Sequence, residues 1–461
     1  MNRDAIDLGK LKIPYLFRIY FVPTLFGMLS ICALTVTDGI FVGQGVGSDA
    51  LAAVNICVPP TMLMVGIGLM LGVGASVVSS VHLAENKIKT ARLNVTQALV
   101  FGSVLVAVFL SCTLINPART ARLLGSSETL LPYALDYMPL LFIDCMFQIW
   151  CAIGLFIVRL DGSPKYAMWC NVVPGIMNIV LDYIIIFPLG MGLWGAAVAT
   201  AVSCFCGFLM VMFYLIGFAS KLRLIKIKLS KTSMALFLRN IGYQCKIGLS
   251  AFIGEATMGI LMFTGNLVFM HYIGDSGVGA FSIICYYCPF VFMLGNAIAQ
   301  SAQPIISYNY GLHQSKRVTE TERIAILTAV CIGILITVMF QFIPSHLAGL
   351  FLDESADAYK LAVKGMPYFS VAFVFFIFNL TAIGYFQSVE DVLLATVFSL
   401  LRGVVFLIPA FVTMPLIAGT TGIWLALFVS ELMTSIAIIC YFMYKRHSCG
   451  NPERLHITSR N

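Results

Sequence analysis

The sequence predicts an all-α polytopic membrane protein with twelve transmembrane helices in two six-helix lobes. Three observations lead to this fold class: the composition, the length of the apolar runs and an internal repeat. Of the 461 residues, 60% are hydrophobic and 11% are charged, and the mean hydropathy is +0.94. A soluble chain usually carries about 25% charged residues. The composition therefore indicates a chain that lies largely within a lipid bilayer.

Twelve apolar runs between charged or Gly/Pro breaks are the predicted spans. Each is long enough to cross most or all of a ~30 Å hydrocarbon layer as a helix, and runs well beyond about 20 residues are expected to be tilted or kinked. The predicted spans are 14–43, 51–82, 93–116, 132–158, 164–188, 193–218, 240–272, 277–309, 322–343, 362–387, 392–415 and 422–444.

Twelve spans place both termini on the same side of the membrane. With that side taken as the cytoplasm, 23 of the 28 Lys and Arg residues lie in or next to cytoplasmic segments. The others are Arg402, within a span, and four outside residues, Arg119, Arg122, Lys360 and Lys364. Because cytoplasmic loops carry an excess of Lys and Arg, this bias predicts cytoplasmic termini. It also explains the net charge of +7 without a nucleic-acid partner.

The two halves of the chain carry a weak internal repeat. Residues 37–56 align without a gap over residues 264–283, and "YMPLLF" at 137–142 aligns with "GMPYFS" at 365–370. Two six-helix halves in the same orientation imply pseudo-two-fold symmetry about the membrane normal. That arrangement is typical of transporters.

A strongly basic segment separates the two halves. It predicts an N-lobe of helices 1–6 at residues 1–220, a cytoplasmic basic linker at 221–239, and a C-lobe of helices 7–12 with a cytoplasmic tail at 240–461. The linker region, "SKLRLIKIKLSKT", is compatible with an amphipathic helix on the membrane surface.

Ionisable residues inside the spans are the best functional candidates, because each costs several kcal/mol unless it faces protein or water. Asn178 and Asp182 are four residues apart and project from one helix face. With Asp38 from another helix, they could hold a proton or a small hard cation such as Na⁺. The alternative is a buried hydrogen-bonded pair that only fixes helix packing. In the repeat, Asp38 aligns with Gly265, so this carboxylate belongs to one half only.

Other polar residues within the spans leave functional and structural interpretations open. Glu255 lies on the seventh span, well inside its apolar run. Asp144 is either a cavity residue or a capped structural one, and Arg402 and Glu431, on spans eleven and twelve, could neutralise each other. Pro23 lies fifteen residues before Asp38 on the same predicted helix, where a proline makes a natural kink. Further intramembrane polar candidates are Gln300 and Gln303.

The sequence shows no Walker motif, nucleophile elbow or H-E-x-x-H, and no cofactor is expected. The absence of a nucleotide-binding domain argues against direct ATP drive. These observations favour a secondary transporter over an enzyme.

Three motifs then resemble one known family. They are "TDGIFVG" with "ALAAV", "RLDGSPKYAMWCNVVPGIMNIVLDYIII" with "GLWGAAVAT", and "NAIAQSAQPIISYNYG". Together they resemble the multidrug and toxic compound extrusion (MATE) family, most closely its bacterial MepA/DinF branch. The resemblance covers the whole chain and implies twelve helices in two lobes. It also implies alternating access and a multi-pass protein of the bacterial inner membrane.

The resemblance also implies a set of site residues. The family's N-lobe cation site matches Asp38, Asn178, Asp182 and Thr200, so Na⁺ at these residues is one expectation and H⁺ the other. The helix-one proline matches Pro23. A C-lobe cation or substrate site in some members pairs a helix-seven glutamate, matched by Glu255, with a helix-ten aspartate. The tenth span here contains no acidic residue, which favours the N-lobe as the coupling site.

The function predicted from these features is export of organic, often cationic or amphipathic, compounds by antiport with H⁺ or Na⁺. We expect a monomer in the bilayer. The alternative function is a flippase or exporter of a lipid-linked or biosynthetic precursor, for which the single Arg402 supplies no large cationic groove. An intramembrane enzyme is a third, remote class, because no convergent catalytic set is found.

Overall fold

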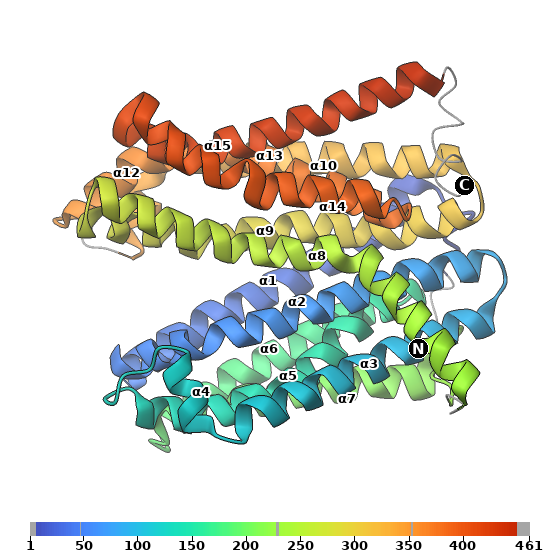
Figure 1. Cartoon of the computed structure of the whole chain (residues 1–461), viewed down its shortest axis with the longest axis horizontal. Helices are drawn as coiled ribbons and strands as arrows, with labels where there is room; N and C mark the ends of the chain where they lie inside the picture. Colours follow the sequence, from blue (N-terminus) through green and yellow to red (C-terminus); the bar gives the residue numbers. More distant parts are fainter. Residues whose placement is uncertain (1–5, 47, 227–229, 352–353, 450–461) are drawn as a thin grey trace. The chain divides into compact units, whose positions relative to one another are not determined.

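The computed structural model describes residues 6–46, 48–226, 230–351 and 354–449, and its regular secondary structure there is entirely helical. Long apolar runs explain this, because in a bilayer a helix satisfies its own backbone hydrogen bonds. The helices are α1 (Ile13–Gly45), α2 (Ser48–Ala84), α3 (Ile88–Leu114), α4 (Pro117–Leu123), α5 (Leu131–Leu160), α6 (Pro164–Ile186), α7 (Gly192–Phe213), η1 (Tyr214–Phe218), α8 (Lys231–Tyr272), α9 (Asp275–Gly311), α10 (Ser315–Phe342), α11 (Pro344–Gly349), α12 (Asp357–Ser370), α13 (Ala372–Ser388), α14 (Val392–Leu400), η2 (Leu401–Val405) and α15 (Leu407–Cys449) (Figure 1).

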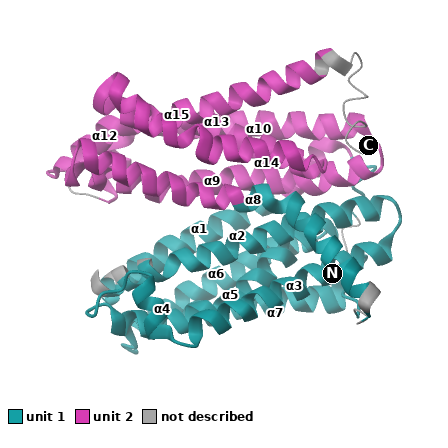
Figure 2. Cartoon of the chain, in the orientation of Figure 1, with its two compact units in different colours: residues 1–11, 22–252 teal, residues 12–21, 253–461 magenta. Residues whose placement is uncertain are grey.

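The chain forms two compact units (Figure 2). Unit 1 contains residues 1–11 and 22–252, and unit 2 contains residues 12–21 and 253–461. Both α1 and α8 therefore contribute to both units. The predicted lobe boundaries at 220 and 240 stay a prediction. Part of the predicted linker is helical, because α8 already begins at Lys231.

The number of membrane spans in the described residues depends on how two interrupted helical stretches are counted, α12–α13 and Val392–Lys445. Ten helical stretches are long and apolar enough to cross a membrane, and α12 and α13, bent by 46° at their junction, make an eleventh. One of the ten, Val392–Lys445, has 54 residues, far more than the ~20 that a bilayer needs. It is interrupted at Ala418 and Gly419, where the backbone is not helical. Counted as two spans, it gives twelve.

Unit 1 is built around α5, which packs against α2, α3, α6 and α7. Small residues allow this close packing: a Cβ added at Gly154 of α5 would overlap Val211 of α7, and one at Gly72 of α2 would meet Phe156 of α5 at 2.7 Å. Glycine at such positions lets membrane helices approach closely. The motif "DGSP" closes one end of the unit, because Asp161 accepts hydrogen bonds from the backbone N–H groups of residues 220–222 at 2.6–2.9 Å.

Unit 2 is centred on α13, which packs against α9, α10, α14 and α15. Its interior is rich in aromatic rings in edge-to-face and stacked contacts. Phe269 stacks on Phe281 at 4.7 Å and meets the edge of Trp424 at 4.7 Å. Such pairs stabilise a core beyond the area that they bury.

The turns of the two halves repeat the same backbone conformation. Asn86 (φ 59°) in the turn after α2 is matched by His313 (φ 57°) after α9, and Gly162 (φ 90°) after α5 by Glu390 (φ 58°) after α13. Gly192 and Gly419 form a third pair, both at φ 59°. Side chains other than glycine rarely adopt this left-handed region. Its recurrence at corresponding turns therefore supports the internal repeat.

Candidate cation-coupling site

The predicted N-lobe site residues gather in unit 1 from three helices. Asp38 lies on α1, Asn178 and Asp182 on α6, and Thr200 on α7. The Asp38 and Asp182 carboxyl groups lie within hydrogen-bonding range of each other, and Asn178 interacts with Asp182 on its own helix. The Asn178 amide donates a hydrogen bond to the Thr200 hydroxyl at 3.4 Å. The four side chains thus form one connected cluster.

The cluster contains buried oxygen atoms with no hydrogen-bond donor in the described residues. They are Oδ1 of Asp38, both carboxyl oxygens of Asp182 and Oδ1 of Asn178. Asp182 and Asn178 are 0% and 1% exposed. A buried polar atom left unsatisfied costs about 1–3 kcal/mol, and more when charged. Two facing carboxyl groups and an amide oxygen are therefore arranged for a shared proton or for a hard cation such as Na⁺, which takes oxygen ligands.

Tyr137 of α5 is a member of this environment that the sequence did not identify. Its buried phenol is an electrostatic neighbour of Asp38, Asp182 and Asp144. The side chain lies within an apolar cluster that includes Val42, near Asp38 on α1. A tyrosine at helical spacing among apolar residues is indistinguishable from a core residue in the sequence. Only the fold brings it to the acids.

Pro23 and Asp144 occupy different settings in unit 1. Pro23 is buried and α1 remains helical through it. Asp144 of α5 is 0% exposed; its Oδ2 accepts a hydrogen bond from Gln148 at 2.6 Å, while its Oδ1 has no partner in the described residues. The sequence left Asp144 open between a cavity role and a structural role.

Arg402 and Glu431, the two charged residues predicted on spans eleven and twelve, form a separate buried ion pair in unit 2. Arg402 of η2 and Glu431 of α15 make a buried ion pair at 2.9 Å, as the sequence suggested. Asn379 of α13 donates to Glu431 at 2.7 Å and accepts from Ser435 at 2.8 Å, and the Arg402 guanidinium lies 4.1 Å from the centre of the Phe376 ring. Asn379 could not be identified from the sequence, because a lone amide in a span has no spacing partner.

Glu255 is not joined to that network. It is half-buried on α8, and no hydrogen bond or ion pair reaches it from the described residues. The structure does not pair it with a second acidic residue, so its predicted site role stays a prediction. Gln300 and Gln303 are buried in α9.

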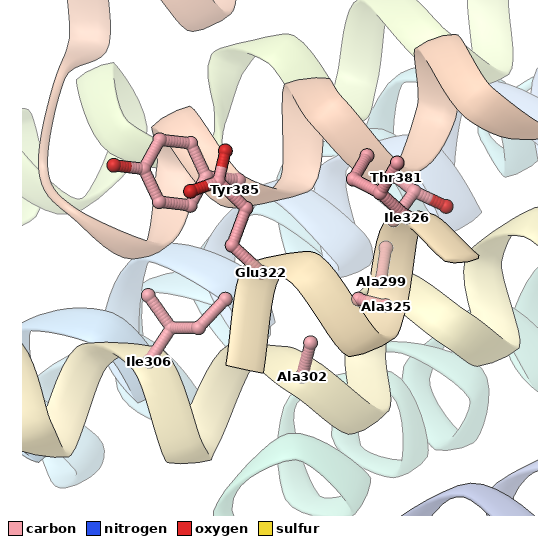
Figure 3. Close-up of a pocket in the computed structure, with 8 residues that line it drawn as sticks. All are labelled: Ala299, Ala302, Ile306, Glu322, Ala325, Ile326, Thr381 and Tyr385. Carbon is pink, nitrogen blue, oxygen red and sulfur yellow. The ribbon is translucent and has the colours of Figure 1, made fainter. Parts of the chain in front are cut away.

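Unit 2 also holds a small pocket whose lining residues include none of the predicted site residues (Figure 3). Glu322 of α10 and Tyr385 of α13 lie side by side at its rim, and alanines of α9 such as Ala299 and Ala302 line it (Figure 3). It plays no part in the function proposed below.

The positions in unit 2 that match Asp38 and Tyr137 are filled by aromatic rings. Asp38 aligns with Gly265 and Tyr137 with Gly365. A Cβ added at Gly265 would overlap the Phe281 ring, and one at Gly365 would overlap the Trp424 ring. No side chain fits at either position. The oxygen-rich cluster of unit 1 therefore has no counterpart at these two positions in unit 2.

Twelve apolar spans with a buried polar cluster in one half define the class of this protein, a polytopic membrane transporter. Comparison with known proteins gives the family. The MatE family model matches residues 23–184 and 251–412, once in each half of the repeat. The chain belongs to the MatE family, which confirms the resemblance, the fold class and the prediction of a transporter instead of an enzyme.

Relatives and solved structures match along almost the whole chain. The multidrug export protein MepA of Staphylococcus saprophyticus is 25% identical over 443 residues, which cover 94% of this chain and 95% of MepA. MepA of Staphylococcus aureus strain MRSA252 is 24% identical over 442 residues, 94% of each chain. A structure of a multidrug resistance MATE family transporter of the MOP superfamily, in the outward-facing conformation, gives a TM-score of 0.89 with 21% identity, covering 96% and 98% of the two chains.

A second solved structure shares the fold under a different functional description. It is a MOP superfamily transporter from Pyrococcus furiosus, for which a binding pocket of reverse polarity is said to suggest a different function. Its TM-score is 0.86 at 21% identity, and the match covers 97% of this chain and 98% of that one. At this identity both structures show the fold alone.

Proposed function

We propose that this transporter exports organic, often cationic or amphipathic, compounds by antiport with H⁺ or Na⁺, and that Asp38, Asn178, Asp182 and Thr200 bind the coupling ion. The single observation that carries the proposal is the set of unpaired buried oxygens on Asp38, Asp182 and Asn178. The export function of the MepA relatives supports the direction of transport.

The arrangement of the site on its helices suggests how ion binding drives a conformational change. Asp38 is the only one of the four residues on α1, while the other three lie on α6 and α7. With the site empty, two buried carboxylates repel each other and α1 is held less firmly. A bound proton or Na⁺ removes the repulsion and ties α1 to α6 and α7. The ion thus shifts the balance between two states of the protein.

Pro23 supplies a place for α1 to bend. It lies fifteen residues before Asp38, about 22 Å along the helix at 1.5 Å per residue. A proline inside a helix removes one backbone hydrogen bond. The segment that carries Asp38 can therefore move relative to the start of α1 without breaking the whole helix, which suits alternating access.

The energetics of one coupling charge are sufficient for useful export. Moving one elementary charge across 100 mV releases about 2.3 kcal/mol. Because about 1.4 kcal/mol is a factor of ten in an equilibrium constant, this sustains a roughly 50-fold gradient of a neutral substrate.

The orientation and oligomeric state are part of the same proposal. The distribution of Lys and Arg supports cytoplasmic termini in a bacterial inner membrane. Each of the four proposed ion-binding residues lies in unit 1 of one chain, so a monomer contains the complete site.

Replacing Asp38 by Asn tests the proposal. The substitution keeps the size of the side chain but removes the charge that binds the ion, so efflux of ethidium from energised cells should fall at least tenfold. Asp136→Asn removes an exposed carboxylate from α5 and should leave efflux unchanged, provided that both variants reach wild-type levels in the membrane. Undiminished, ion-dependent efflux by Asp38→Asn would refute the proposed site.

A further inference from the structure

Asp144 is the acid of unit 1 that the proposed coupling mechanism does not use. It is 0% exposed, in the middle of the membrane-spanning helix α5. A charged carboxylate in such a place is costly unless a cation or several donors compensate it. The surroundings of Asp144 therefore determine whether it is a charged carboxylate, an acid that exchanges a proton, or a purely structural residue.

The groups that face Asp144 supply an amide and a thiol as hydrogen-bonding partners and no positive charge in the described residues. Gln148, one turn later on α5, donates to Oδ2 at 2.6 Å. The Cys204 thiol of α7 lies beside the carboxyl group, and Tyr137, Cys145 and Cys151 of α5 are electrostatic neighbours. Among the described residues, no charged group of α2, α3 or α6 acts on it and none is a hydrogen-bond partner of Oδ1.

This environment suits a carboxyl group that exchanges a proton. A purely structural carboxylate is normally satisfied at both oxygens, whereas Oδ1 of Asp144 has no hydrogen-bond partner in the described residues. Gln148 can donate to Oδ2 in both states, and Oδ1 is left as the place for the proton. An amide and a thiol without a counter-ion hold neither the charged nor the protonated state of Asp144 exclusively.

Tyr137 is a neighbour both of Asp144 and of the proposed ion-binding pair, Asp38 and Asp182. It lies seven residues before Asp144, two turns along the same face of α5. Its phenol is an electrostatic neighbour of Asp144 and of both Asp38 and Asp182. A phenol both donates and accepts a hydrogen bond. The Tyr137 phenol is thus suited to couple the protonation of Asp144 to that of the Asp38–Asp182 pair.

We infer that Asp144, with Gln148, Cys204 and Tyr137 around it, is a second proton-binding site of unit 1, separate from the Asp38–Asp182 pair. It binds one proton at Oδ1 and releases it during the transport cycle. The inference rests on the proposed function for its meaning in transport, but its proton exchange can be measured without transport.

Infrared difference spectroscopy of the purified protein in lipid tests this site. The spectrum between acidic and alkaline buffer should contain a carboxylic acid C=O band that Asp144→Asn removes and that Asp38→Asn/Asp182→Asn retains. Adding ethidium to the wild-type protein should reduce the same band, because substrate binding follows proton release. The number of protons released per protein in the pH step should fall by one in Asp144→Asn.

Two outcomes would overturn the inference. One is a wild-type difference spectrum in Asp144→Asn; the other is an Asp144 band that responds neither to pH nor to ethidium, which would make it a permanently protonated structural acid. If Asp144→Asn does not fold, Gln148→Leu provides the assignment, because the Asp144 band should shift in frequency when Oδ2 loses its donor. An unshifted band would contradict the assignment. Failure of the efflux test with Asp38→Asn would leave these spectra unaffected, so the two proposals fail separately.

Discussion

Asp38 and Gly265 show at the residue scale why only one half of the repeat offers an oxygen-rich cation site. Asp38 on α1 faces Asp182 on α6. Oδ1 of Asp38 has no hydrogen-bond donor in the described residues. At the matching position Gly265 leaves room for the Phe281 ring, which stacks on Phe269. One half of the repeat carries a carboxyl group at this position, and the other has aromatic packing there.

Gly265→Ala tests the packing half of that contrast. The new methyl group would overlap the Phe281 ring, and overpacking a core costs about 1–3 kcal/mol. The melting temperature in detergent should therefore fall. Gly259→Ala is the matched control on the same helix, because a Cβ there meets nothing within 4 Å. It should stabilise the protein by up to about 1 kcal/mol through helix propensity. Equal melting temperatures for the two variants would contradict the packing argument.

The sequence identified part of the candidate site and missed the rest for definable reasons. Asn178 and Asp182 were visible because a spacing of four residues places them on one helix face. Joining them to Asp38 and Thr200 needed the family resemblance, since no spacing rule links different helices. Tyr137 could not be identified from the sequence, because its proximity to the acidic residues depends on which helices α5 packs against.

At the scale of elements, the backbone conformation of the turns shows the internal repeat at positions where the residue types differ between the two halves. Asn86 and His313 share a left-handed conformation although their side chains differ, as do Gly162 and Glu390. The sequence alignment could not show this, because it compares side chains. The backbone conformation is the same at these matched turns although the residues differ.

His313→Gly tests the cost of that retained conformation. A side chain in the left-handed region costs about 1–2 kcal/mol, and glycine loses about 0.5–1 kcal/mol through the entropy of the unfolded chain. Because His313 is exposed, the substitution should stabilise the protein by about 0.5–1 kcal/mol. Gly162→Ala, at φ 90°, should destabilise it by about 1 kcal/mol. Thermal melts in detergent measure both, and a lower melting temperature for His313→Gly would count against the turn argument.

The helix boundaries illustrate where composition gives an element but not its shape. The predicted spans 392–415 and 422–444 correspond to the single stretch Val392–Lys445, which contains the π-helix η2 and is kinked at Ala418 and Gly419. The predicted span 362–387 is instead two helices, α12 and α13, bent by 46°. Hydropathy reports how many apolar residues are present, whereas a bend depends on how neighbouring helices pack.

At the scale of the whole molecule, the membrane class followed from composition and the repeat from weak local alignments. The family model matches each half once, which agrees with that repeat. The boundaries between the two lobes are harder to predict from the sequence than the membrane class or the repeat, because the two units divide within long helices. Residues 12–21 belong to unit 2 although they begin the chain's first long helix, and α8 is divided between the units at 252. Long-range packing of this kind leaves no local signal in the sequence.

The central claim is that an ion bound between Asp38 and Asp182 drives substrate movement. Its most direct test is uphill ethidium transport by the purified protein in liposomes, with an imposed pH gradient or sodium gradient collapsed in turn. We predict that at least one gradient drives transport in the wild-type protein and that Asp38→Asn/Asp182→Asn abolishes it. Uphill transport that persists after both gradients are collapsed, or that the double variant retains in full, would contradict the account.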